Sequence, residues 1–265
     1  MPAPAPRILA ALAVAAAPTL GSPAPAVGGT TAGDPVPATA ITTWADIQAT
    51  PGGYRFRSAR HDNHLTVTLT AEGLRLEDTA TDRLSSYPAG CEEVEVADGI
   101  AAVCAVPADV SAEDPLLLEV APRRGDDLVD AGSVPATVEL AVLADAGADV
   151  VRTGAGDDFV NGASGRERVH GGAGDDWIRT GLGRDRIRGG DCNDRLVGVE
   201  KGDVLRGGAG DDELGGGPGD DRLYGGPGLD EARCSTGTDV AYVEEEDLAT
   251  PDCETVQADP TARGG

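Results

Sequence analysis

Residues 171–179 read GGAGDDWIR, and the same nine-residue pattern recurs along the second half of the chain. From Ala144 to Tyr242 the sequence divides into eleven consecutive blocks of nine without an insertion. Clear further copies are 153–161 (TGAGDDFVN), 207–215 (GGAGDDELG) and 216–224 (GGPGDDRLY). A fixed internal period of this kind is typical of a solenoid, in which each repeat packs on its neighbours.

Three positions of the repeat define the pattern. The sixth is acidic and the eighth apolar in all eleven blocks, and the fourth is glycine in nine, with Cys192 and Lys201 as exceptions. Acidic residues make up 46 of 265, so acidity at all eleven sixth positions has a chance probability of roughly one in 10⁸ to 10⁹. The window also contains 25 of the 38 glycines, and this register argues against a disordered glycine-rich chain.

The spacing predicts a glycine-rich turn of six residues followed by a three-residue strand. Side chains alternate along a strand, so the apolar eighth residue points inward and the ninth outward, which suits Arg152, Arg179, Arg188, Arg206 and Arg233. Glycines let the turn expose its carbonyl groups. Calcium takes 6–8 oxygen ligands from carboxylates and carbonyls. One such turn supplies about half of that shell, and two stacked turns supply all of it.

The pattern GGxGxDxUx resembles the RTX, or haemolysin-type, calcium-binding nonapeptide repeat, over about 99 residues. This resemblance implies an all-β, right-handed parallel β-roll (a β-solenoid) with several Ca²⁺ ions in its turns and a small β-rich segment before it. Two nonapeptides form one coil in the family, so alternate repeats stack on the same side. The expected metal ligands are the sixth-position aspartates and one from an earlier half-motif at 125–129: Asp127, Asp149, Asp158, Asp176, Asp185, Asp194, Asp203, Asp212, Asp221, Asp230 and Asp239.

The two sides of the implied roll are unequal. One carries Asp158, Asp176, Asp194, Asp212 and Asp230, and the other carries Asp149, Glu167, Asp185, Asp203, Asp221 and Asp239. Glu167 lengthens a ligand arm on the second side, and Lys201 places a cation there, so we expect tighter calcium sites on the first side. One inward aliphatic side chain per nine residues is a thin core, and stacked aspartates repel one another. We therefore expect the repeats to fold on binding calcium.

The rest of the chain divides by composition. Residues 1–26 resemble a secretory signal peptide, with a disordered Ala/Pro tail as the alternative, and 27–52 resemble a disordered linker. Residues 53–120 form a β-rich segment with strand-like runs at 65–69, 94–96, 100–106 and 116–120. The roll is expected over 121–242, with a possible start near 116 and a four-residue irregularity around 140–143. Residues 243–265 would form a C-terminal cap and tail.

Five cysteines suit an exported protein. Cys91 with Cys104, and Cys234 with Cys253, are the pairs that would close short loops, although four cysteines allow three pairings and the sequence leaves the connectivity open. Cys192 would then stay a free thiol. A zinc site is the weaker alternative because no Cys-x-x-Cys motif occurs. Secreted RTX members of high-GC bacteria are similar in having a Cys-containing β segment before the repeats and a Cys-containing end.

A formal net charge of −25 argues against nucleic acid or an anionic membrane surface as partner. No apolar run is long enough to span a bilayer. The HDNH stretch at 61–64 is half a metal site at most, and no catalytic motif such as Gly-x-Ser-x-Gly occurs. The sequence thus indicates a secreted calcium-binding protein without catalysis of its own. The alternatives are an adhesin or cell-envelope protein that associates with a surface or with itself and, less favoured, a small secreted hydrolase.

Overall fold

The computed structural model describes residues 45–58 and 62–258, which lie in one compact unit from Thr43 to Gly265. These residues form strands and turns only, and they contain no helix long and apolar enough to span a membrane. The expected signal peptide and most of the expected linker fall outside the described residues. The linker does not extend to residue 52, because β1 (Ala45–Thr50) is a strand within its last part.

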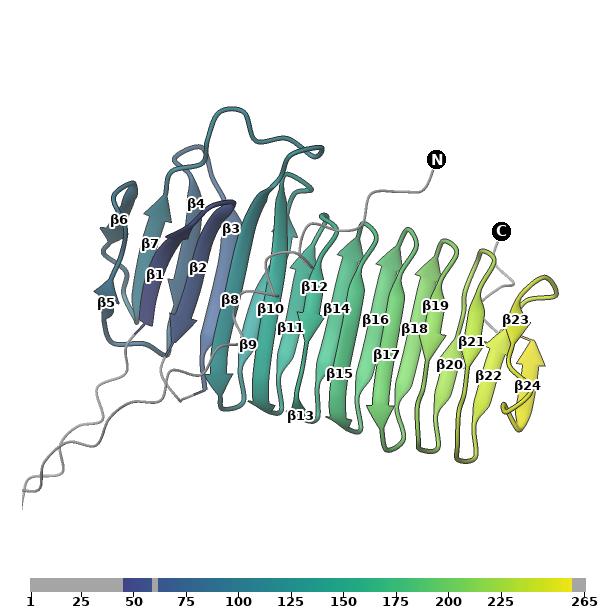
Figure 1. The fold of residues 1–265 in the computed structure, drawn as a ribbon. Helices are drawn as coiled ribbons and strands as arrows, with labels where there is room; N and C mark the ends of the chain where they lie inside the picture. The colour runs from purple at the N-terminus through teal and green to yellow at the C-terminus, as the bar shows by residue number, and fades with distance from the viewer. Residues whose placement is uncertain (1–44, 59–61, 259–265) are drawn as a thin grey trace, which may run out of the picture. The chain divides into compact units, whose positions relative to one another are not determined.

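The unit is a parallel β-solenoid of about eight turns with two sheets (Figure 1). The first sheet contains β8 (Leu116–Arg124), β10 (Val138–Gly147), β12 (Phe159–Asn161), β13 (Ser164–Gly165), β15 (Trp177–Gly183), β17 (Arg195–Glu200), β19 (Glu213–Gly215), β21 (Glu231–Arg233) and β23 (Leu248–Ala249). The second contains β9 (Leu128–Val134), β11 (Val150–Gly154), β14 (Arg168–Ala173), β16 (Arg186–Asp191), β18 (Val204–Ala209), β20 (Arg222–Tyr224), β22 (Val240–Val243) and β24 (Thr255–Ala258). From β8 onward successive strands of the chain alternate between the sheets, except that β12 and β13 both lie in the first.

The register of the parallel strands confirms that two nonapeptides form one coil. Phe159 pairs with Trp177 and Trp177 pairs with Arg195, each step being 18 residues. In the second sheet Arg168 pairs with Arg186 at the same spacing. Equivalent positions of alternate blocks therefore lie directly above one another, as the family resemblance implied.

The eighth-position side chains form the interior of the solenoid. Val160, Ile178, Leu196 and Leu214 have no exposed surface, and the whole column is buried down to Ala241. The five ninth-position arginines are all exposed. These exposures confirm the alternation expected from a three-residue strand. The eighth-position side chains of the two sheets point toward each other and form the core between them.

The expected irregularity in the repeat lies earlier than 140–143. Leu116 pairs with Val138 and Asp130 pairs with Arg152, both 22 residues apart, so this coil is four residues longer than the others. From Ala141, which pairs with Phe159, the spacing is 18. The four extra residues consequently lie between Asp130 and Val138, where they widen the connection from β9 to β10.

The strands before β8 are β2 (Gly53–Ser58), β3 (His64–Leu69), β4 (Leu74–Asp78), β5 (Leu84–Ser86), β6 (Cys91–Val94) and β7 (Ile100–Cys104), after β1. The expected run at 94–96 is strand only at its first residue. β4, β6 and β7 pair antiparallel, whereas β2 and β3 pair in parallel with β8 and β9. The solenoid therefore starts with a coil made of β2 and β3, which the sequence did not indicate.

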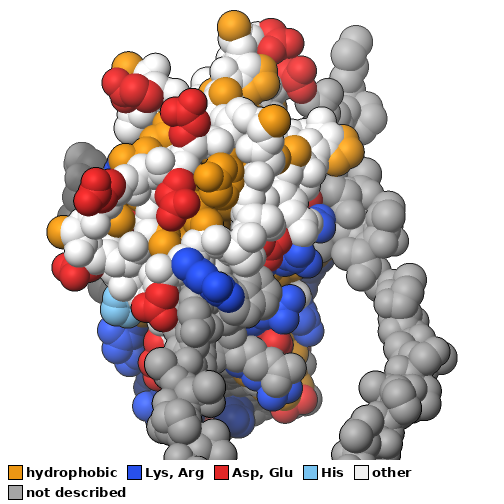
Figure 2. Space-filling view, turned by 90° about the vertical axis from the view of Figure 1, so that its left-hand side faces the viewer, with side chains coloured by type: hydrophobic (Ala, Val, Ile, Leu, Met, Phe, Trp, Pro, Cys, Tyr) orange, Lys and Arg blue, Asp and Glu red, His pale blue; other side chains and the backbone are white. Residues whose placement is uncertain are grey.

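Both ends of the solenoid carry a disulfide bond, in the pairing that spacing suggested. Cys91 is bonded to Cys104 and Cys234 to Cys253, while Cys192 is free and exposed. Figure 2 looks onto the N-terminal end, where acidic side chains are scattered among apolar ones. Glu92 and Glu93 on β6, the last strand of its sheet, are exposed. Such charges discourage an open edge from pairing with another chain.

Candidate functional site: stacked carboxylates in the turns

The sixth-position carboxylates form two columns, one in each row of turns. In the first row the backbone N–H of Asp158 donates to Oδ1 of Asp176 (2.9 Å), and Asp176 donates in the same way to Asp194 (2.9 Å). The second row repeats this bond, for example from the N–H of Asp185 to Oδ1 of Asp203 (2.8 Å). From Asp158 to Asp239 each of these aspartates thereby joins its coil to the coil 18 residues earlier, whereas Asp149 makes the same bond across 22 residues.

The other oxygen of each aspartate has no partner. The carboxylates are 0–2% exposed, and their Oδ2 atoms are buried without a hydrogen bond. These Oδ2 atoms belong to the eleven aspartates that the sequence indicated: Asp127, Asp149, Asp158, Asp176, Asp185, Asp194, Asp203, Asp212, Asp221, Asp230 and Asp239. A buried polar atom left unpaired costs free energy, and most native structures avoid it. Eleven such oxygens in register fit the role of ligands to cations.

The first glycine of a block makes room beside this orphaned oxygen. A Cβ added at Gly171 would lie 2.0 Å from Oδ2 of Asp176, and one at Gly207 would lie 2.1 Å from Oδ2 of Asp212. Thr153 and Thr180 replace this glycine in two blocks. Their hydroxyl groups donate to the carbonyls of the first residue one coil later, at 2.7 and 3.3 Å.

Backbone carbonyls accompany the carboxylates along the stack. The carbonyl oxygen of Gly190 lies 1.9 Å from where a Cβ of Gly208 would be, and that of Gly210 lies 1.8 Å from the equivalent point at Gly228. Both glycines also have positive φ, 138° and 152°. The second and fourth positions thus favour glycine, both for the turn conformation and for the close approach of successive coils. Carbonyl and carboxylate oxygens together fit the preferences of calcium.

Burial raises the pKa of most of these carboxyl groups, and neighbouring carboxylates add to the effect. The pKa rises to about 9 for Asp176 and to about 8 for Asp203. It rises to about 7 for Asp158, Asp194, Asp212 and Asp230, and to about 6 for Asp127, Asp149 and Asp221. Without a cation, part of each column would hold protons at neutral pH.

Four departures from the repeat have structural consequences. The Glu167 carboxylate has both oxygens buried without a hydrogen bond, and burial together with Asp185 raises its pKa to about 9. Cys192 and Lys201 keep the turn conformation of the glycine they replace, with φ of 79° and 72°. Val199 has φ of 106°, which a β-branched residue rarely adopts.

Sequence reasoning missed a second, exposed ladder at the fifth position. The N–H of Asp175 donates to Oδ1 of Asp157 (2.9 Å), and the N–H of Asn193 donates to Oδ1 of Asp175 (2.9 Å). The doubled acid in the GDD triplets was the available signal. In the described ranges, no three His, Cys, Asp or Glu side chains gather as a metal cluster, so backbone oxygens would have to complete any coordination shell.

Asp62 and Asn63 of the HDNH stretch directly precede β3 in the first coil. The backbone N–H and the side-chain amide of Asn63 donate to Oδ1 of Asp127, at 2.7 and 2.8 Å. In the stack of coils, Asn63 thus lies next to Asp127 at the N-terminal end of the second column. His61 lies outside the described residues.

Comparison with known families matches the RTX calcium-binding nonapeptide repeat to residues 142–166, 170–200 and 197–231. Neither the curated proteins nor the solved structures with which the chain was compared include a match. The matched segments contain nine of the eleven aspartates in the two columns, all except Asp127 and Asp239. The repeat region, residues 142–231, therefore belongs to the RTX calcium-binding nonapeptide repeat family.

Proposed function

We propose that this protein is a secreted calcium-binding β-roll whose repeat region folds on binding several extracellular Ca²⁺ ions, without catalysis of its own. The observation that carries the proposal is the column of buried aspartate oxygens without partners, one in each coil of each row. The eleven aspartates from Asp127 to Asp239 would supply the carboxylate ligands. Carbonyl groups of the glycine-rich turns would supply the remaining oxygens. Calcium would neutralise both columns.

Coupling of folding to calcium follows from the charge of the columns. In the calcium-free protein, each folded turn buries an acid beside the acids of the coils before and after it. Ionised carboxylates in that position are costly unless a cation compensates them. A ligand that binds only the folded state stabilises it by mass action. Extracellular calcium modules typically have dissociation constants of about 10⁻⁴–10⁻³ M, which suits a chain that folds after export.

Circular dichroism of the mature chain during calcium titration tests this proposal, with isothermal titration calorimetry for stoichiometry. We expect a low β content in chelator, a cooperative gain on adding Ca²⁺, and little response to Mg²⁺, which prefers a rigid octahedral site. An unchanged β spectrum in chelator contradicts coupled folding. The absence of calcium-binding heat contradicts the metal sites.

Secretion and the absence of catalysis remain part of the proposal. The signal-like residues 1–26 and the two disulfide bonds support export. The strongly raised carboxyl pKa values all belong to the stacked columns, so a structural role accounts for them. Export can be checked by sequencing the N-terminus of the secreted chain. Protease, lipase and nuclease assays in calcium check catalysis, and turnover that survives purification contradicts it.

A structural role in the cell envelope is the second candidate. The last coil exposes Leu248 on β23 and Val256 on β24, 68% and 52% of their surface. Exposed apolar side chains on a terminal coil favour end-to-end contact between copies. Sedimentation velocity with and without calcium separates the candidates. Calcium-dependent polymers that Leu248→Lys abolishes would favour the structural role.

A further inference from the structure

The outer face of the second sheet carries a row of cations that the calcium sites do not use. The seventh and ninth positions of this sheet from β11 to β22 include seven basic residues and no acidic one. The basic residues are Arg152, Arg168, His170, Arg186, Arg188, Arg206 and Arg222, all exposed. The chain has a net charge of −25, so a face with only basic side chains differs in charge from most of the protein.

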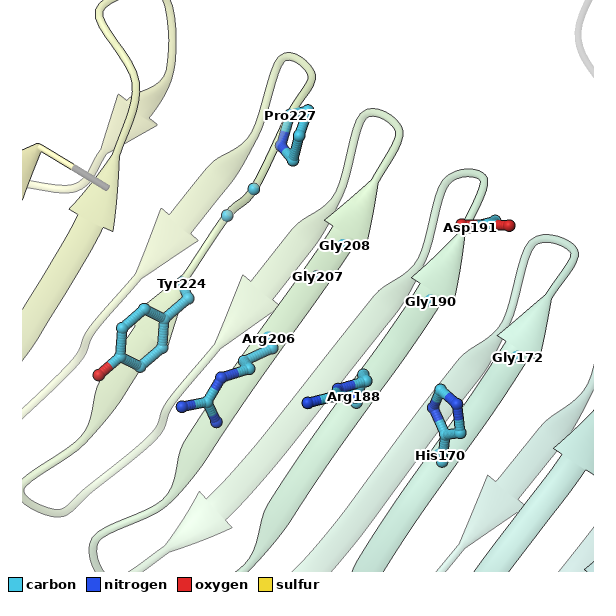
Figure 3. Close-up of a pocket in the computed structure, with 12 residues that line it drawn as sticks. His170, Gly172, Arg188, Gly190, Asp191, Arg206, Gly207, Gly208, Tyr224 and Pro227 are labelled. Carbon is cyan, nitrogen blue, oxygen red and sulfur yellow. The ribbon is translucent and has the colours of Figure 1, made fainter. Parts of the chain in front are cut away.

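An open groove of about 710 Å³ runs along this face. Figure 3 shows His170, Arg188, Arg206 and Tyr224 one after another on neighbouring strands. Gly172, Gly190 and Gly208 are among the glycines that line it, and Asp191 is its one acidic lining residue. With strands 4.7–4.9 Å apart, the row from His170 to Tyr224 spans about 14 Å, with one side chain at each step.

Within the described part of the chain, Arg188 and Arg206 of the groove have no carboxylate partner. No salt bridge joins Arg188 or Arg206 to an acid anywhere in 45–58 or 62–258, whereas on the first sheet Glu213 pairs with both Arg195 and Arg233. An unpaired guanidinium presents its fork of N–H donors to a carboxylate from solution. The outer faces of the two sheets consist of the same seventh and ninth positions of the repeat. Their difference in charge therefore comes from the side chains at these positions and not from the fold.

Two tyrosines close one end of the row. Tyr224 stacks on Tyr242 with ring centroids 4.3 Å apart, and the Arg206 guanidinium lies 4.5 Å from the Tyr224 centroid. Because β18 and β22 flank β20 on opposite sides, both faces of the Tyr224 ring are covered. The ring therefore has no free face on which a nucleic acid base would stack.

We propose that this groove binds a linear acidic polysaccharide that carries a carboxylate on each sugar, along the row from His170 through Arg188 and Arg206 to Tyr224. Each cation would meet one carboxylate as the polymer crosses successive strands, and sugar hydroxyl groups would face the glycine floor. The cationic side chains of the site lie outside the turns, although turn glycines such as Gly207 and Gly225 line its floor. The polymer would lie across the strands rather than at the ends of the solenoid. Calcium in the turns would hold the coils at the spacing that aligns the cations.

Isothermal titration calorimetry of the calcium-loaded full chain with a six-residue oligogalacturonate tests this site. The test variant is Arg188→Gln with Arg206→Gln, and the matched control is Arg179→Gln with Arg184→Gln, which removes the same charge from exposed residues that do not line the groove. We expect about tenfold weaker binding for the test variant, because it loses charge-assisted hydrogen bonds to the carboxylates. The control should bind almost as tightly as wild type. Binding should weaken with added NaCl.

Four outcomes would overturn the proposal. The first is no binding of the oligomer to wild-type protein whose β spectrum and calcium stoichiometry are intact, a check that separates this result from a failure of calcium binding. The second is equal binding by wild type, test variant and control, as calcium bridging between two anions would produce. The third is equal binding of a neutral oligosaccharide. The fourth is equal or tighter binding of a single-stranded oligonucleotide of similar charge, which would replace the polysaccharide with nucleic acid.

Discussion

Oδ1 of Asp176 accepts a 2.9 Å hydrogen bond from the backbone N–H of Asp158, 18 residues earlier, while Oδ2 of Asp176 is buried without a partner. One carboxylate thus does two separate things. It fastens a coil to the preceding coil through a neutral donor, and it presents a second oxygen that only a cation or a proton satisfies. Substitutions can separate these two functions.

Asp176→Asn should have opposite effects with and without calcium. Asparagine keeps an oxygen for the N–H of Asp158 and replaces the orphaned oxygen with an amide that carries no charge. In chelator the variant should retain more β structure than wild type, and in saturating calcium it should unfold at a lower temperature. The calcium-dependent shift should be about 2–4 °C for each kcal/mol of lost binding. Circular dichroism in chelator and thermal melts in calcium measure the two effects, and effects of the same sign would contradict the assignment.

Asp176→Ala should lose more bound calcium than Glu167→Ala. Asp176 lies between two regular aspartates in the first row, whereas Glu167 makes no hydrogen bond to the preceding coil in the second. Calcium stoichiometry by calorimetry or equilibrium dialysis compares the two variants. Equal losses would show that the rows bind calcium alike.

Glu167→Asp should strengthen the second row. The shorter arm would place Oδ1 as in its neighbours, to accept the N–H of Asp149, and one hydrogen bond contributes about 1 kcal/mol. The same change should raise calcium affinity at this coil. Urea unfolding in calcium measures the first effect, with Glu200→Asp on an exposed residue as control. A destabilised variant would mean that the glutamate has a role that aspartate cannot fill.

Acidification should stabilise the calcium-free roll and weaken calcium binding. The folded-state pKa values of about 6 to 9 lie above the ordinary aspartate value of 3.8, so the folded state holds protons that the unfolded state has released. This stability is fully present below pH about 4 and is lost as the pH rises through 6 to 9. Thermal melts in calcium-free buffer from pH 4.5 to 8.5 check the direction. Calorimetry in buffers of different ionisation enthalpy should detect protons released on calcium binding.

Val199→Gly should stabilise the protein by about 1 kcal/mol, because φ of 106° strains a β-branched residue and suits glycine. Val197→Gly, two residues earlier in β17, is the control and should destabilise, since glycine weakens a strand interior. Denaturant midpoints in saturating calcium compare the two variants. A loss of stability in Val199→Gly would mean that packing of the valine outweighs its backbone strain.

Much of the fold was accessible from the sequence because the repeat is local. Side-chain alternation over three residues places Ile178 inside and Arg179 outside, whatever lies further along the chain. The aspartates with orphaned oxygens were also found directly, since a sixth-position acid in a glycine-rich turn has few other uses. The sequence did not reveal that β2 and β3 add a coil, because no nonapeptide marks them. It also did not locate the extra residues between Asp130 and Val138, whose register depends on the strands they join.

The sequence by itself determined the nine-residue unit, its inward and outward faces, and the eleven acids that calcium would require. Only the tertiary structure decided which residues share a face. Arg188 and Arg206 are 18 residues apart and become neighbours because two nonapeptides close one coil. A net charge of −25 averages over the whole chain, so it concealed a basic groove on one sheet. Because equivalent residues of successive coils lie on neighbouring strands, one basic residue in each coil is enough to form a continuous basic surface.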